Sequence, residues 1–443
     1  MTDVVAEGAP DTDGTSSRRS LRPLGVVLAA IAVSLTGTRI SAIALPWFVL
    51  VTTGSATQTG LVACCEMTPY VVVKALAGPL VDRTGPRGVS WTTDLLSAAA
   101  ACAVPLLHAV DLLSLPLLLV LVALIGAARG PGDLAKEVMV PAAAERSRVP
   151  LERATGLAGV TERLASTIGP AAGGSLVALL GPLAGLLVNA GCFALGSVIV
   201  ALVLPRGVGT AAAGAPPDGE AQPDYWRRFG EGFIFLRGEP LLLTIIAMVG
   251  ITNLLDAAFN TVLMPVWANE SGHGPTDIGL NSSTGGLSAV AGSLAATAAA
   301  HRMRRRVVFF AGFLLAGAPR FLILASDAPR WAVLTVFAVG GFGAGFLNPI
   351  LGAMSFERVP RRLLGRVNAL GDALAWAGIP LGGLLGGAMV ASFGLVPVLL
   401  TGAALYFLTT SLTGLRPEWR AMDRGRGRER GRTAHCETAS DGP

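Results

Sequence analysis

Several charged side chains stand inside long apolar stretches of this sequence, where a charge is costly. Arg39, Glu66 and Lys74 interrupt the first two stretches, Arg129 lies near the end of the fourth, and Asp256 lies in the middle of the seventh. On insertion scales a charge at the centre of a membrane helix costs about 2.5–3.5 kcal/mol, so such residues indicate function or ion pairing. These five residues are therefore candidates for proton coupling or for lining a cavity.

Glu66 and Asp256 are the strongest candidates for a carboxyl group that takes up and releases a proton. A carboxyl group can do this when it moves between a buried environment and an arginine partner. Arg39 and Glu66 should lie at similar depth in adjacent helices, which predicts a buried ion pair that lines the cavity; a purely structural pair is the alternative. Tyr70 and Lys74 follow Glu66 at i+4 and i+8, on the same helix face.

The composition requires a membrane around these residues. Of the 443 residues, 52% are apolar or aromatic and only 14% are charged, whereas about 25% are charged in an average soluble domain. This polar fraction is too small to cover a soluble core of that size, and the same values exclude a disordered chain. The sequence therefore predicts an all-α integral membrane protein with many spans.

Twelve apolar runs are long enough to cross the membrane, because ~30 Å of hydrocarbon requires about 20 helical residues. Arginine and lysine residues fall in alternate loops, which predicts that both termini are cytoplasmic. The chain is expected in the cell inner (plasma) membrane. The predicted spans are 24–51, 57–81, 89–109, 113–133, 153–180, 182–204, 241–267, 276–299, 307–326, 330–353, 367–392 and 394–415.

An internal repeat divides the twelve spans into two pseudo-symmetric six-helix bundles. A shift of 213 residues places Arg153–Gly181 on Arg366–Gly394 without a gap and aligns their glycines. Two related halves predict a central site and movement of one half against the other. The expected parts are a disordered cytoplasmic segment (1–23), an N-terminal bundle (24–204), a linker with an interfacial helix (205–240), a C-terminal bundle (241–415) and a basic cytoplasmic tail (416–443).

A turn rich in glycine and charge follows the second predicted span, with the sequence GPLVDRTGPR. Asp82 stands at a helix end, where it can pair with arginines, and Gly85 allows a tight turn. Gly78 should let a neighbouring helix approach closely. The pattern predicts an acid–base latch on the cytoplasmic side; an ordinary positive-inside turn is the alternative. The predicted latch residues are Gly78, Asp82, Arg83, Gly85, Arg87 and, as a brace for the turn, Asp94.

This turn resembles the signature loop of the major facilitator superfamily. The segment Ala44–Asp94 is similar to the first spans of its enterobactin-exporter and drug-exporter branch, with ALP at the end of the first span and TGSAT in the outer turn. Arg129 is similar to the fourth-span arginine that is linked to proton transfer in that family. The fifth span is similar to the G-P-x-x-G-G motif of proton-coupled exporters; the matching residues are Gly169, Pro170, Gly173 and Gly174.

The resemblance implies a secondary active transporter that exports drugs, antibiotics or other small amphipathic molecules by proton antiport with alternating access. A metabolite or siderophore importer or facilitator of the same fold is the alternative. The fifth-span motif is interpreted as a hinge, with simple close packing as the alternative. Relatives often carry an acidic residue where this chain has Thr38 beside Arg39, so we expect Glu66 to take over the coupling role.

The sequence contains no G-x-x-x-x-G-K-[ST] loop, no H-E-x-x-H motif and no C-x-x-C pair. We therefore expect no enzyme activity, no cofactor and no metal. The arginine-rich tail RGRGRERGR is interpreted as a solvated segment near lipid headgroups, with RNA binding as the alternative. The expected partners are a small-molecule substrate, protons and the lipid bilayer, without nucleic acid, and the chain is expected to be a monomer.

Overall fold

The computed structural model describes residues 21–205, 208, 230, 233–299, 304–360, 363–417 and 419. Every regular element in these residues is a helix, which confirms the predicted all-α fold. The predicted arginine-rich tail and most of the predicted interfacial helix lie outside the described residues.

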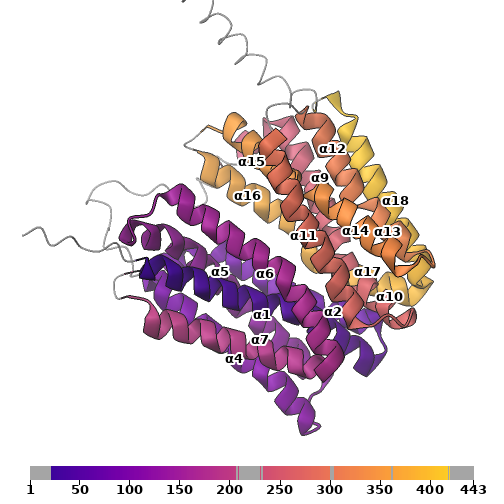
Figure 1. Cartoon of the computed structure of the whole chain (residues 1–443), viewed down its shortest axis with the longest axis horizontal. Coiled ribbons are helices and arrows are strands. Elements are labelled where there is room, and N and C mark those ends of the chain that lie inside the picture. The colour runs from indigo at the N-terminus through magenta and orange to yellow at the C-terminus, as the bar shows by residue number, and fades with distance from the viewer. Residues whose placement is uncertain are drawn as a thin grey trace, which may run out of the picture.

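The first group of helices forms the N-terminal half, drawn from indigo to magenta in Figure 1. Within it α1 packs against α6 and α7, and α5 packs against α2 and α4. These helices are α1 (Arg22–Thr53), α2 (Ala56–Leu76), the short α3 (Gly78–Thr84), α4 (Pro86–Ala109), α5 (Leu115–Arg146), α6 (Leu151–Leu180), α7 (Pro182–Val198) and the π-helical η1 (Ile199–Val203).

The second group, drawn in rose to yellow, forms the C-terminal half beside the first (Figure 1). Its largest cluster of buried apolar side chains includes Phe259, Phe309, Phe321 and Trp419. The helices are α9 (Pro240–Ala258), η2 (Phe259–Leu263), α10 (Met264–Glu270), α11 (Pro275–Ala299), α12 (Arg305–Ala316), α13 (Ala318–Leu324), α14 (Arg330–Ala344), α15 (Leu347–Arg358), α16 (Leu364–Trp376), α17 (Ile379–Phe393) and α18 (Leu395–Gly414).

Ten helical segments in the described chain are long and apolar enough to cross a membrane. Two further predicted spans, α6 and α11, are 30 and 25 residues long but are less apolar. The first half of α6 carries Glu162 and Arg163, and α11 is rich in serine, threonine and glycine. Both helices lie where the two halves meet, so part of their surface contacts protein instead of lipid.

Several predicted spans differ from one continuous helix. The ninth, tenth and eleventh are each divided, with breaks at Gly317, Gly345 and Gly378. Pro319 and Pro380 stand two residues after a break, and proline begins a new helix readily because it has no N–H to place in the preceding turn. The fourth span is longer than predicted, because α5 continues to Arg146 instead of ending at residue 133.

The two halves meet along two pairs of helices, α2 with α17 and α6 with α11. At the first, Gly60 and Gly383 face each other so closely that a side chain on Gly60 would overlap the Gly383 carbonyl group. At the second, Gly174 and Gly279 face each other in the same way. Bare glycine backbone therefore forms the close contact between the halves.

Candidate functional site

A cavity of about 610 Å³ lies in the N-terminal half between α1, α2, α5 and α6. Trp376 of α16, in the other half, also lines it. This volume falls in the range of small-molecule sites, about 300–1,000 Å³. The charged side chains that line it are Arg39, Lys74, Arg129, Asp133, Lys136, Glu137 and Glu162.

Arg129 forms the central ion pair of this cavity. Its Nη1 lies 2.9 Å from Oε1 of Glu66, and its Nε lies 3.7 Å from Oδ2 of Asp133. The Tyr70 hydroxyl group donates to Asp133 over 3.4 Å, and the Arg129 guanidinium lies 4.3 Å from the Tyr70 ring centroid. The Arg129 and Glu66 side chains are only 10% and 16% exposed, so the pair is largely desolvated.

The predicted ion pair between Arg39 and Glu66 is wrong, because Glu66 is bound to Arg129. The reason is the packing of α2, which lies along α5 far more extensively than along α1. Gly126 and Gly130 make this close approach possible: a side chain on Gly126 would overlap the Glu66 backbone, and one on Gly130 would crowd the backbone of Tyr70. The i, i+4 glycine spacing before and after Arg129 was visible in the sequence and could have predicted this pairing.

Two further ion pairs connect α5 with its neighbours. Nζ of Lys136 lies 2.7 Å from Oδ1 of Asp94, and both side chains are 5% exposed or less. Nζ of Lys74 lies 2.9 Å from Oε1 of Glu137. The expectation that Asp94 braces the Asp82 turn is therefore wrong. Asp94 is held by Lys136, which lies beyond the predicted end of the fourth span and is buried because α5 continues to Arg146.

The turn after α2 contains most of the residues that are predicted to form the latch. Gly85 has φ of +84°, a conformation that side chains disfavour. Nη2 of Arg87 donates to the carbonyl oxygen of Ala201 over 2.8 Å, which fixes α4 to the end of the sixth span. Asp82 and Arg83 are exposed, and no ion pair of either is found in the described part of the chain.

Gly78 does not have the predicted packing role. No heavy atom of the described residues lies within 4 Å of the position that a Gly78 side chain would occupy. Gly78 instead begins α3, with Pro79 in its first turn. The close approach of helices in this half is made by Gly126 and Gly130.

The glycines of the fifth-span motif face two different neighbours. Side chains on Gly169 and Gly173 would meet Arg39 and Ile40 of α1, in the same half. A side chain on Gly174 would meet α11, in the other half. Pro170 lies inside α6, which continues unbroken from Leu151 to Leu180. The motif thus packs α6 against one helix of each half.

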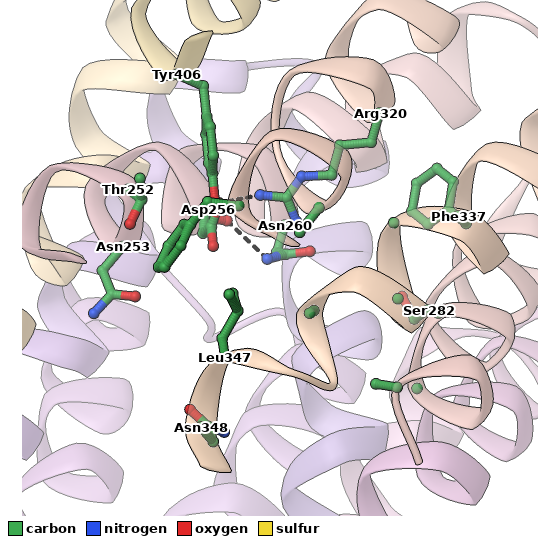
Figure 2. A pocket seen from close by; sticks show the side chains of 18 of the residues that line it. Thr252, Asn253, Asp256, Asn260, Ser282, Arg320, Phe337, Leu347, Asn348 and Tyr406 are labelled. Atoms are coloured by element: carbon green, nitrogen blue, oxygen red, sulfur yellow. Dashed lines mark hydrogen bonds and ion pairs between the residues drawn. The ribbon is translucent and has the colours of Figure 1, made fainter. Parts of the chain in front are cut away.

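A second cavity of about 410 Å³ lies inside the C-terminal half (Figure 2). Arg320 of α13 points toward Asp256 of α9 and forms an ion pair with it. The Arg320 guanidinium lies 4.7 Å from the ring centroid of Phe259 and 5.8 Å from that of Tyr406. Nδ2 of Asn260 donates to the Asp256 carbonyl oxygen over 2.8 Å. The pair of Asp256 and Arg320 therefore lies beside aromatic rings in a cavity that asparagine side chains also line.

Local breaks in the helices position this second pair. Gly317 ends α12 three residues before Arg320, and a side chain on Gly317 would overlap the Tyr406 ring. The π-helical turn η2 begins three residues after Asp256 and contains Asn260; such turns are frequent at functional sites. Sequence reasoning identified Asp256. Arg320 is a charge within the predicted span 307–326, but no sequence signal indicated Tyr406.

Among the residues that the structure describes, no group of three or more His, Cys, Asp or Glu side chains could hold a metal ion. Apart from Glu162, the carboxylates that line the two cavities are instead paired with arginine or lysine. What the arrangement can do is bind a small molecule and exchange protons at paired carboxyl groups.

Comparison with known proteins places this geometry in a family. The model of the Major Facilitator Superfamily matches residues 27–255 and 246–430. The multidrug efflux pump Tap of Mycolicibacterium fortuitum is 31% identical over 409 residues, which cover 89% of this chain and 97% of that protein. The pump of the same name from Mycobacterium tuberculosis is 31% identical over 408 residues, covering 90% of this chain and 95% of that protein.

Solved structures share the fold. A bacterial homologue of the human lysosomal transporter Spinster, in an inward-facing and unoccupied conformation, superposes with a TM-score of 0.69 at 12% identity. The match covers 93% of this chain and 99% of that chain.

Proposed function

Because this chain belongs to the major facilitator superfamily, we propose that it is a secondary active transporter that exports small amphipathic molecules such as drugs or antibiotics in exchange for protons. The observation that carries the proposal is the 31% identity, over nearly the whole of both chains, to proteins named multidrug efflux pumps. The cavity in the N-terminal half has a volume suited to such a cargo.

Glu66 is the proposed proton-coupling residue. It contacts Arg129, and Arg129 lines the cavity whereas Glu66 is not among the lining residues. A proton on Glu66 removes the negative charge that holds Arg129, so Arg129 is then held by Asp133 and Tyr70 alone. Protonation of Glu66 thereby changes the ion pairing of Arg129 at the cavity wall, where cargo binds. Asp256, with its partner Arg320, is the second proposed site of proton exchange.

The proton gradient supplies enough energy for export. At ~100 mV one proton that moves inward releases ~2.3 kcal/mol, which supports a roughly 40-fold gradient of a neutral solute. Alternating access through relative tilting of the halves is supported by the glycine contacts between α2 and α17 and between α6 and α11, because helices that meet through glycine backbone can separate there without rearranging interlocked side chains.

We propose a monomer in the plasma membrane with both ends of the chain in the cytoplasm, and a boundary between the halves at residues 205–240. The alternation of basic loops supports this orientation. On it, the Asp82 turn faces the cytoplasm and can form the latch in the state in which that side is closed. Thiol labelling of single cysteines placed in the Asp82 turn tests the orientation: labelling from outside the cell would contradict it.

Export is tested in a drug-hypersensitive bacterium that expresses the chain. The inhibitory concentration of at least one lipophilic compound should rise, and a protonophore should abolish the rise. Inverted vesicles with an imposed pH gradient then measure uptake of the same compound directly. Absence of any effect across a broad panel of compounds would contradict the proposal.

A further inference from the structure

Arg39 differs from the other basic residues that line the cavity of the N-terminal half. Each of the other three has a carboxylate within ion-pairing distance: 2.9 Å from Lys74 to Glu137, 2.9 Å from Arg129 to Glu66, and 2.7 Å from Lys136 to Asp94. For Arg39 the described part of the chain offers no carboxylate within 4.0 Å, and its Nε is buried without a hydrogen-bond partner.

The packing of α6 makes space for this side chain. The position of a Gly169 side chain would lie 2.5 Å from Cβ of Arg39 and 3.3 Å from its Cγ. The stem of Arg39 therefore lies against bare backbone, and the guanidinium lines the cavity. Gly169, which the sequence analysis interpreted as part of a hinge, forms the backbone surface against which the Arg39 side chain packs.

The carboxylates near Arg39 do not neutralise it by direct contact. Glu162 of α6 lines the same cavity, but it is exposed and lies beyond ion-pairing distance. Asp133 is engaged by Arg129 and Tyr70. An arginine in the middle of a span is costly, and its N–H groups act only as donors. An anionic acceptor that enters the cavity would therefore form both an ion pair and hydrogen bonds with Arg39.

We infer that Arg39 is the residue that selects cargo, and that the preferred cargo is an amphipathic molecule that carries an oxyanion, such as a carboxylate or phenolate. The inference rests on the proposed export function and adds the substrate class to it. A guanidinium presents N–H donors in a planar fork that matches the two oxygens of a carboxylate, and such charge-assisted bonds are about twice as strong as neutral ones. Glu162, which lines the same cavity, disfavours a second negative charge on the same cargo.

The test uses a matched pair of fluorescent probes, dansyl-phenylalanine with a free carboxylate and its methyl ester. Equilibrium binding of each to the purified full chain in lipid nanodiscs is measured by fluorescence anisotropy. We expect the wild-type chain to bind the acid about tenfold more tightly than the ester. R39Q should remove this preference while leaving the affinity for the ester unchanged.

Three further variants sharpen the result. R39K keeps the charge without the planar fork and should retain part of the preference. G169A keeps the charge but displaces the stem of Arg39 and should reduce the preference, so these two variants decide the question if R39Q does not fold. R163Q, which changes an exposed arginine of α6 that does not line the cavity, is the control and should bind both probes as the wild type does.

Equal binding of acid and ester by the wild-type chain would overturn the inference. An equal loss of both probes in folded R39Q would also overturn it, because Arg39 would then support the fold of the cavity without reading the carboxylate. Binding in nanodiscs is independent of transport, so a preference for the acid without proton-driven export in vesicles would contradict the proposed function and leave the assignment of Arg39 intact.

Discussion

The two halves of the molecule share their helix packing but differ in where they place charge. The glycines of α6 and α17 that are 213 residues apart make equivalent contacts. Gly169 and Gly382 face the first helix of their own half, and Gly174 and Gly387 face the second helix of the other half. The internal repeat is therefore a repeat of backbone contacts.

The buried acid–base pairs do not follow this repeat. In the N-terminal half Glu66 and Arg129 join the predicted second and fourth spans, next to a cavity that both halves line. In the C-terminal half Asp256 and Arg320 join the seventh and ninth spans, which correspond to the first and third. The comparison teaches that the glycine contacts follow the internal repeat, whereas the buried ion pairs join non-equivalent spans in the two halves.

The largest expected effect is the loss of one partner of a buried ion pair. E66Q and R129Q should each destabilise the chain by about 3–5 kcal/mol, because the remaining charge is left buried. The double variant should be less destabilised than the sum of the single ones. D256N and R320Q should show the same pattern with smaller values, because the Asp256 side chain is 34% exposed. Thermal denaturation in detergent measures all six variants; additive effects in either half would contradict the pairing.

A difference in transport should separate the two carboxylates. E66Q should lower proton-driven flux by about 100-fold, as expected when a group that transfers protons is removed. Exchange of cargo without a gradient should fall less, and D256N should have the smaller effect on driven flux. Vesicle assays with and without a pH gradient compare the two. If D256N proves the more damaging, coupling belongs to the C-terminal half.

The equivalence of the glycine contacts can be tested by two matched substitutions. G174V and G387V each place a side chain between the halves, and overpacking of this kind costs about 1–3 kcal/mol. Both should slow transport. Both should also favour the state in which the two halves are apart at the end of the molecule that contains Gly174 and Gly387. G191V is the control, since no heavy atom of the described residues lies within 4 Å of the position of a Gly191 side chain. Transport rates and cysteine accessibility near Gly54 provide the measurement; an effect of only one substitution would show that the repeat is not functionally symmetric.

The smallest expected change concerns Asp82. Because Asp82 is exposed and has no ion pair among the described residues, D82N should leave the melting temperature within about 1 °C of wild type. If the turn forms a latch in another state, D82N should still reduce the rate of transport several-fold. Wild-type transport by D82N would remove the latch from the mechanism.

Much of the fold could be predicted from the sequence because it depends on apolar length, charge in loops and the spacing of glycines. The repeat of Gly169 and Gly174 at Gly382 and Gly387 predicted two related halves, and the structure gives these residues equivalent neighbours. The helix breaks were harder to predict. At Gly317, where one helix ends, the Tyr406 ring occupies the space that a side chain would need, and that contact joins residues far apart in sequence.

The candidate site was predicted less completely for a similar reason. The expected depth of each residue in the membrane paired Glu66 with Arg39. How closely two helices approach, however, depends on where small residues lie. Gly126 and Gly130 bring α5 against α2 and so assign Glu66 to Arg129. Arg39 then has no carboxylate within 4.0 Å in the described part of the chain, which no single position in the sequence could indicate.

The close contact between Gly60 and Gly383 has a consequence for the rate of transport. Where two helices interlock through side chains, parting them requires rotamers to rearrange and apolar surface to be exposed. At the glycines backbone meets backbone, so the two helices can separate there without a change of rotamers. The Thr57 hydroxyl group donates to the Gly387 carbonyl oxygen over 3.4 Å between the same two helices. We expect the turnover rate of the transporter to be limited by rearrangement of the charged groups in its cavities and not by the separation of α2 from α17.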